Sequence, residues 1–217
     1  MKKLIIFDCD GTLVDSEIIA AQVFPAMWAS MGVEMTEEFF IYNFVGTGPD
    51  AEIVKQTAAR LPANAKEVSE KKFNEELNKN LKSIKGMKEL IEKLPHQVCV
   101  ASNSSYDYIL RVLAITELHS FFENRVYSSR QQGRPKPAPD VFLHAAKTLG
   151  FEPSECIVIE DSVPGILAAQ NAKMTVIGLM AGMHFSPLVR EKLLNAKADY
   201  YCNDVAELDE LILKLSK

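Results

Sequence analysis

The stretch that decides the fold is Leu4–Ser16, which reads LIIFDCDGTLVDS. It opens with aliphatic and aromatic residues typical of a buried strand, and Gly11 then breaks the strand pattern. Because strand side chains alternate with a period of two, Asp8 and Asp10 are predicted to start on the same side of the backbone. Their mutual repulsion and desolvation are costly, and a hard cation between them lowers that cost. An acidic turn has the same letters, so the rest of the chain must decide.

The composition is that of a globular protein with a substantial core. Of 217 residues, 47% are hydrophobic and 24% are charged, and the net charge is −5. An acidic chain offers no basic face, so neither nucleic acid nor an anionic membrane is an expected partner. Asp8 cuts the apolar N-terminal run short, and no run is long enough to span a bilayer. The isolated cysteines suit buried, reduced thiols, and we expect a cytoplasmic protein: Cys9, Cys99, Cys156 and Cys202.

Strand-like runs alternate with helical segments along most of the chain. The runs are Leu4–Phe7, Gln97–Ala101, Arg125–Tyr127, Cys156–Ile159, Thr175–Ile177 and Asp199–Tyr201. Apolar strands that alternate with helices are typical of a parallel sheet covered on both faces. The sequence therefore predicts an α/β fold.

The connection between the first two strands is too long for a simple crossover. A crossover needs only about a dozen residues, whereas this one carries four helical segments: Glu17–Met31, a helix from Thr36, Ala51–Leu61 and Ala65–Leu81. The excess predicts a second, helical domain. We expect a split core, residues 1–15 and 86–217, with a helical cap inserted at 16–85. The apolar stripe of the first helix, which includes Phe24 and Trp28, could line a substrate pocket, but it is expected to form the core of this cap.

Polar residues from four segments are predicted to meet at one edge of the sheet. Asp8 follows the first strand, Ser102 the second, and Glu160 and Asp161 the fourth, while Lys136 lies in the stiff loop RPKPAPD. The carboxyl edge is where open α/β sheets bind ligands. Each residue also has an ordinary reading as a helix cap, a loop cation or the start of a helix. Four placements at the same edge favour a functional site.

This set of side chains suits phosphate hydrolysis, which needs a nucleophile, charge neutralisation and an acid for the leaving oxygen. Asp8 is the candidate nucleophile and would form an aspartyl phosphate. Asp10 would protonate the leaving alcohol and then act as the base toward water. Asp8 and Asp161, with the backbone carbonyl of Asp10, are the candidate ligands of Mg²⁺.

The remaining residues of this edge are assigned to the phosphoryl group and to the surroundings of the metal. Lys136 and the hydroxyl of Ser102 would hold phosphoryl oxygens, together with backbone N–H groups around Cys9–Gly11. Glu160 is expected to orient the site from behind the metal ligands, and direct ligation by Glu160 stays open.

The motifs DCDGTLVDS, SNS at Ser102, RPKPAPD and IEDS at Glu160 resemble the four motifs of the haloacid dehalogenase superfamily. More narrowly, the chain is similar over its whole length to the small-cap branch that contains β-phosphoglucomutase and many sugar-phosphate phosphatases. The resemblance implies a Rossmann-like core, a helical cap, Mg²⁺ and a small phosphorylated metabolite as substrate, with Thr12 and Asn103 beside the phosphate. Asp10 argues against the namesake dehalogenases, which lack a second aspartate at this spacing.

Two other functions compete with a phosphatase. A signalling receiver domain also phosphorylates an aspartate beside Mg²⁺, but the inserted helices and Asp10 argue against it. β-Phosphoglucomutases carry a cap histidine where this chain has Ala20, and an arginine where it has Pro49. Both differences favour transfer of the phosphoryl group to water.

The sequence is less informative about the cap and about assembly. Gly46, Thr47 and Gly48 lie where the resemblance implies a substrate loop, although a flexible turn between helices reads the same way. The histidines are interpreted as surface or packing residues, because they lack the paired spacing of a metal site: His96, His119, His144 and His184. The sequence does not indicate an oligomeric state or a particular substrate.

Overall fold

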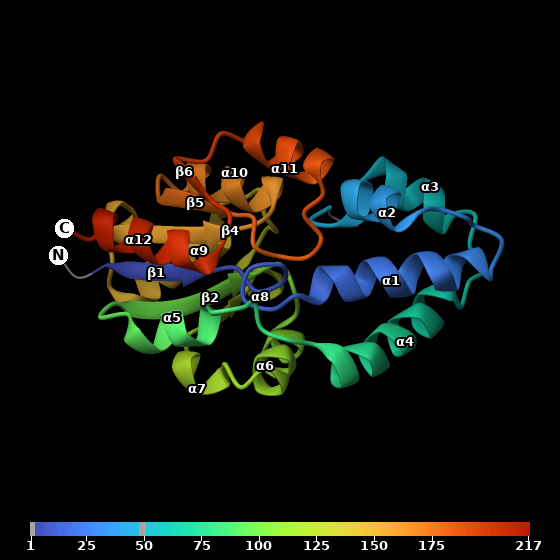
Figure 1. Ribbon diagram of the computed structural model, residues 1–217, viewed down its shortest axis with the longest axis horizontal. Coiled ribbons are helices and arrows are strands. Elements are labelled where there is room, and N and C mark those ends of the chain that lie inside the picture. Colours follow the sequence, from blue (N-terminus) through green and yellow to red (C-terminus); the bar gives the residue numbers. More distant parts are fainter. Residues whose placement is uncertain (1–2, 48–50) are drawn as a thin grey trace.

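Six parallel strands form one sheet in the computed structural model, which describes residues 3–47 and 51–217 (Figure 1). The strands are β1 Leu4–Phe7, β2 Gln97–Ser102, β3 Val126–Ser128, β4 Cys156–Glu160, β5 Thr175–Leu179 and β6 Tyr200–Cys202. Their order is β3-β2-β1-β4-β5-β6, so β1 lies between β2 and β4, with Ile6 opposite Cys99 and Val158. The strand carrying the first motif is thus flanked by the strands carrying two others.

Helices cover both faces of the sheet, as the apolar strands require. Ile5 and Phe7 belong to a buried cluster on one face, whereas Leu4 and Ile6 belong to a second cluster on the other. The first cluster includes residues of α5 Met87–Lys93, α6 Tyr106–Ile115, α7 His119–Phe122 and α12 Val205–Leu215. The second includes residues of α9 Asp140–Leu149, α10 Val163–Asn171 and α11 Pro187–Leu194. Period-two alternation in a four-residue strand therefore builds both layers of the core.

The predicted α/β fold is confirmed, and each predicted strand is present close to its expected bounds. Several short elements were not predicted: α7, α8 Ser129–Gln132, the 3₁₀ helix η1 Pro153–Glu155 and α11. Elements of three or four residues have too few positions to show a helical period. The start of α11 does carry a recognisable signal, because Ser186 caps it and Pro187 is its first residue.

Four helices lie beyond one end of the sheet (Figure 1). They are α1 Ser16–Ala29, α2 Glu37–Phe44, α3 Glu52–Ala58 and α4 Ala65–Asn80. Aromatic rings join three of them, because Phe24 lies 5.7 Å from Phe40 and 5.4 Å from Phe73 between ring centroids, and Trp28 lies 5.5 Å from Phe44. The prediction that Phe24 and Trp28 form a helical core is confirmed. The division of the chain into a core and a cap stays a prediction.

The two connections to these helices run side by side. The backbone N–H of Ile84 donates to the carbonyl of Leu13 at 2.9 Å, and the backbone N–H of Asp15 donates to the carbonyl of Lys82 at 3.0 Å. Both connections leave the sheet at the edge where β1 ends, so α1–α4 are tethered beside that edge (Figure 1).

Two further sequence observations can be compared with the structure. Among residues 3–47 and 51–217, no helix combines the length and the apolar character that crossing a membrane requires. All four cysteines are buried and unpaired, which confirms the prediction of buried thiols.

Candidate active site

Asp8 lies immediately beyond β1 and is nearly enclosed. The strand ends at Phe7, but the Asp8 N–H still donates to the Ile159 carbonyl at 3.0 Å and so continues the ladder with β4. Asp8 is only 7% exposed. Its position is therefore fixed by the backbone of two adjacent strands, at the carboxyl edge that the sequence predicts.

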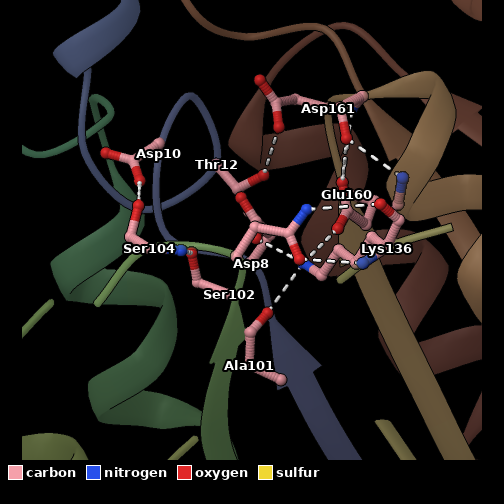
Figure 2. A network of polar contacts seen from close by, with 12 residues as sticks. Asp8, Asp10, Thr12, Ala101, Ser102, Ser104, Lys136, Glu160 and Asp161 are labelled. Atoms are coloured by element: carbon pink, nitrogen blue, oxygen red, sulfur yellow. Dashed lines mark hydrogen bonds and ion pairs between the residues drawn. The ribbon is translucent and has the colours of Figure 1, made fainter. Parts of the chain in front are cut away.

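Lys136 reaches Asp8 from the loop that follows α8 (Figure 2). Its Nζ donates to Asp8 Oδ1 at 2.5 Å, to Glu160 Oε1 at 2.6 Å and to the Ala101 carbonyl at 2.8 Å. Burial alone would lower the pKa of this ammonium, but the Asp8 and Glu160 carboxylates outweigh burial and raise the pKa. Lys136 is therefore held as a buried cation between two acidic side chains.

Asn103 fixes the loop that carries Lys136. Its Oδ1 accepts from the Lys136 N–H at 2.9 Å, and its Nδ2 donates to the Lys136 carbonyl at 3.5 Å. The resemblance placed Asn103 beside the phosphate, whereas in the structure the side-chain amide of Asn103 bonds to the backbone of Lys136.

Asp8, Glu160 and Asp161 form a buried acidic cluster whose oxygens lie within 4.8 Å of one another. Burial raises the pKa of Asp8, as do Glu160 and Asp161, although Lys136 counteracts them. Burial also raises the pKa of Glu160, and Asp161 adds to that increase. Three carboxylates beside one ammonium leave an excess of negative charge, and an all-oxygen set of this kind suits a hard divalent cation. A carboxylate oxygen of Glu160 is one of the three possible ligand atoms in this cluster.

Two glycines allow the backbone to approach these carboxylates. A Cβ at Gly11, where φ is +75°, would lie 1.9 Å from Asp161 Oδ2. A Cβ at Gly165 would lie 1.8 Å from the Glu160 carboxyl carbon. Both contacts are far shorter than atoms tolerate, so the turn after β1 and the start of α10 need glycine where they meet the cluster.

Asp161 is contacted on both of its oxygens. Thr12 Oγ1 donates to Oδ1 at 3.2 Å, and His184 Nε2 lies 3.3 Å from Oδ2. The resemblance placed Thr12 beside the phosphate, but its hydroxyl here holds the carboxylate of Asp161. His184, interpreted from the sequence as a surface or packing residue, is buried beside the acidic cluster. It follows β5, so the same carboxyl-edge argument applied to that strand would have pointed to it.

Asp10 is turned toward a different set of side chains (Figure 2). Its Oδ1 accepts from Ser16 Oγ at 2.6 Å and from Tyr108 Oη at 2.8 Å, and its Oδ2 accepts from Ser104 Oγ at 2.7 Å. Because β1 ends at Phe7, strand alternation does not extend to Asp10, so the premise of the expectation that Asp8 and Asp10 share one side does not hold. The acidic cluster accordingly contains Asp8 but not the carboxylate of Asp10.

Tyr108 was not predicted as a site residue. Burial raises the pKa of its phenol, and the neighbouring Asp10 carboxylate raises it further, so the hydroxyl stays a proton donor at neutral pH. Ser104 is the last residue of the motif SNS that begins at Ser102, so the sequence did carry a signal for it. Tyr108 lies on the amphipathic helix α6, whose pattern of apolar residues does not single out a site residue.

Ser102 and the turn at Gly46 lie at the margin of the cluster. Ser102 ends β2, is buried, and its Oγ accepts from the Ser104 N–H at 3.1 Å. A Cβ at Gly46 would lie 3.0 Å from Ser162 Cβ, so this turn contacts the residue just after Asp161. Thr47 donates its N–H to the Phe44 carbonyl, and Gly48 lies outside the described residues.

Comparisons with known proteins identify the family. The family model described as haloacid dehalogenase-like hydrolase matches residues 5–179. The 6-phosphogluconate phosphatase of Escherichia coli strain K12 is 27% identical over 193 residues, which cover 87% of each chain. Hexitol phosphatase B of the same organism is 30% identical over 181 residues, covering 79% of this chain and 81% of the relative. The crystal structure of a conserved haloacid dehalogenase-like protein of unknown function from Agrobacterium tumefaciens is 35% identical, with a TM-score of 0.90 and full coverage of both chains.

The chain therefore belongs to the haloacid dehalogenase-like hydrolases. The resemblance found in the four motifs is confirmed, and a hydrolase is favoured over a receiver domain.

Proposed function

We propose that this protein is a phosphatase that releases inorganic phosphate from a small phosphorylated sugar or sugar acid, with Mg²⁺ as its cofactor. One observation carries the proposal: Asp8 lies buried at the end of β1, in contact with the ammonium of Lys136 and beside the carboxylates of Glu160 and Asp161. The family membership supports the enzyme class, and the relatives named as 6-phosphogluconate phosphatase and hexitol phosphatase support the substrate class.

Asp8 is the nucleophile of the first step. One of its carboxylate oxygens forms a bond to phosphorus while the ester bond between phosphorus and the alcohol oxygen breaks, which leaves an aspartyl phosphate. Asp10 gives a proton to the leaving alkoxide, which departs as the alcohol. In the structure the Asp10 carboxylate accepts hydrogen bonds from Ser16, Ser104 and Tyr108, which hold it at this edge of the sheet.

Water completes the reaction in the second step. Asp10, now deprotonated, accepts a proton from water as the water oxygen bonds to phosphorus. The bond between phosphorus and the Asp8 oxygen breaks, so phosphate leaves and the Asp8 carboxylate is restored. The proton on Asp10 is then the one needed for the next leaving alcohol.

The acidic cluster fits a magnesium ion by its chemistry. Asp8 and Asp161 would hold the ion, together with the Asp10 backbone carbonyl, and Glu160 lies close enough to contribute a carboxylate oxygen. Bound there, Mg²⁺ supplies positive charge that lets a carboxylate and a phosphate dianion approach each other.

Lys136 and Ser102 are the proposed contacts to the phosphoryl oxygens, because both end at the same buried edge as Asp8. Thr12 and Asn103 support the site through their present partners, Asp161 and the Lys136 backbone.

Residues 16–85 are proposed as a cap that reads the leaving alcohol. Gly46 lies against Ser162 beside the cluster, which supports a substrate role for the turn that begins there. Ala20, at the position of the mutase histidine, is buried in an apolar cluster with Phe40 and Ile41, so it brings no proton donor to the site. Pro49, the other position that separates phosphatase from mutase, lies outside the described residues.

The state of the cysteines supports a cellular location for the protein. Four buried, unpaired cysteines fit a reducing compartment, and we propose the cytoplasm.

The purified protein should be tested against a panel of phosphorylated sugars, sugar acids and polyols, with release of inorganic phosphate as the measurement. We expect at least one of them to be hydrolysed in Mg²⁺, and Asp8→Asn to abolish that activity. A parallel reaction with β-glucose 1-phosphate and its bisphosphate activator measures isomerisation. Faster formation of glucose 6-phosphate than release of phosphate from any tested ester would identify a mutase and overturn the proposal.

A further inference from the structure

His184 lies in a buried slot beside the proposed metal ligand Asp161. The residue is 1% exposed, and its Nε2 is 3.3 Å from Asp161 Oδ2. The slot is shaped by backbone, because a Cβ at Gly182 would lie 2.6 Å from the imidazole Nδ1 and Cε1, and a Cβ at Gly11 would lie 3.1 Å from Cε1. Two glycines from separate segments therefore leave just the space that this ring fills.

Hydrogen bonds before and after His184 shape the loop that carries it. The N–H of Met183 donates to both carboxylate oxygens of Asp15, at 3.2 and 3.4 Å, and the N–H of Ser186 donates to the His184 carbonyl at 3.0 Å. The ring of Phe185 packs on the imidazole, with 4.3 Å between centroids. The direction of the His184 ring is thus set by its surroundings.

Packing alone does not explain an imidazole in this slot. Neither ring nitrogen has a partner in hydrogen-bond geometry among the described residues, although Nε2 lies within ion-pair distance of Asp161 Oδ2. A buried polar group without a hydrogen-bond partner lowers the stability of the fold, and an apolar side chain of similar volume would avoid that loss. The acidic partner in the immediate neighbourhood is Asp161, whose other oxygen is already held by Thr12.

His184 also does not fit the role of a metal ligand. The group of ligand atoms that lie within 4.8 Å of one another consists of Asp8, Glu160 and Asp161, and does not include a ring nitrogen of His184. The geometry therefore connects His184 to the site through Asp161.

We propose that His184 is a positioning residue: its Nε2 pairs with Asp161 Oδ2 across 3.3 Å, while Thr12 donates to Oδ1, and the two contacts together orient this carboxylate toward the divalent cation. The inference rests on the metal site of the proposed function. Partners behind a metal ligand typically change metal affinity by about 10–100-fold.

Two amide variants test this with little change in size or polarity. Gln places its amide donor near the position of Nε2, and Asn places it near Nδ1. We expect His184→Gln to bind Mn²⁺ as the unaltered protein does, and His184→Asn to bind it about 10–100-fold more weakly. Free Mn²⁺ is measured by electron paramagnetic resonance, which does not depend on turnover, and near-ultraviolet circular dichroism confirms the fold of each variant. His119→Asn, at an exposed residue of α7, is the matched control and should leave binding unchanged.

The concentration of Mg²⁺ that half-saturates phosphate release gives an independent reading. It should rise in His184→Asn, and maximal activity should largely return at high Mg²⁺. If both amide variants bind Mn²⁺ as tightly as the unaltered protein, or if both are weakened equally, the positioning role is wrong. These results are separable from the proposed function. If the protein hydrolyses an ester but both His184 variants bind Mn²⁺ as the unaltered protein does, only the role of His184 is refuted. If His184→Asn binds Mn²⁺ more weakly than His184→Gln but no ester is hydrolysed, only the phosphatase activity is refuted.

Discussion

Replacing Lys136 by methionine should destabilise the metal-free protein more than any substitution of an exposed cation. The change keeps an unbranched side chain next to the ring of Phe142, which lies 4.8 Å from Nζ, and removes only the charge and its three hydrogen bonds. Asp8 and Glu160 are then left buried without their cation. The Lys136 side chain is 3% exposed, so water cannot take its place at low cost.

The magnitude follows from the loss of a buried ion pair. Removing one partner of such a pair costs about 3–5 kcal/mol. Because the pKa of both carboxyls is already raised, one of them takes up a proton in the variant, and this keeps the loss near the lower end, about 3 kcal/mol. In a chain of this size, about 1 kcal/mol shifts Tm by roughly 2–4 °C, so we expect a decrease of roughly 6–12 °C.

The pH dependence has a defined sign. A carboxyl whose pKa is higher in the folded than in the unfolded state contributes stability at low pH, and this contribution is lost as the pH rises through the folded-state pKa. Without Lys136 the pKa of Asp8 and Glu160 rises further, so the deficit of the variant should be larger at about pH 8 than at about pH 6.

Urea unfolding and calorimetry in EDTA measure both quantities. The control is Arg134→Met, which removes a cation that is 76% exposed in its pair with Asp140 and should cause no measurable loss. A loss no greater than that of the control, or a deficit that grows on acidification, would refute the assigned role of Lys136.

Three further predictions follow from the site and the core. Asp8→Asn should abolish phosphate release with the fold intact, and Asp10→Asn should lower it by about 10²–10⁴-fold, as measured by kcat; substantial activity in Asp8→Asn contradicts the nucleophile. Activity should disappear in EDTA and return with Mg²⁺ or Mn²⁺ but not with Ca²⁺, which favours more ligands at longer distances, and Asp161→Ala should need more Mg²⁺ for half-maximal rate; full activity in chelator contradicts the metal site. Burial raises the pKa of all four thiols, that of Cys156 and Cys202 to about 12, so a thiol reagent at neutral pH should label the native protein only as fast as it unfolds; rapid labelling of any cysteine contradicts this.

The positions of the site residues along the chain could be predicted because strand exits are set by the backbone. Asp8, Ser102 and Glu160 each follow or end an apolar run, and the parallel pairing of β1 with β2 and β4 brings the three together. A short apolar strand between helices has few ways to be buried, so its carboxyl end is predictable from local sequence.

The partners of these side chains could not be predicted in the same way. Asp10 lies in a turn, where no period fixes its direction, and its hydroxyl partners come from the start of α1, the loop after β2 and the helix α6. Whether Asp10 turns toward Asp8 or toward Tyr108 depends on contacts between segments distant in the chain. Local propensity carries no information about such contacts.

The balance of charge links the fold to the proposed chemistry. Among the described residues, one buried ammonium faces three buried carboxylates, which leaves the cluster short of positive charge by an amount that one divalent cation would supply. Apolar side chains in place of this cluster would stabilise the fold at least as well, because paired buried charges are often no more stabilising than well-packed hydrophobic side chains. The glycines at 11 and 165 make room for the carboxylates in particular, since any Cβ there would collide with Asp161 or Glu160. The backbone is thus built around an arrangement that stability alone does not favour, and a bound cation together with an incoming phosphate dianion gives that arrangement a chemical reason.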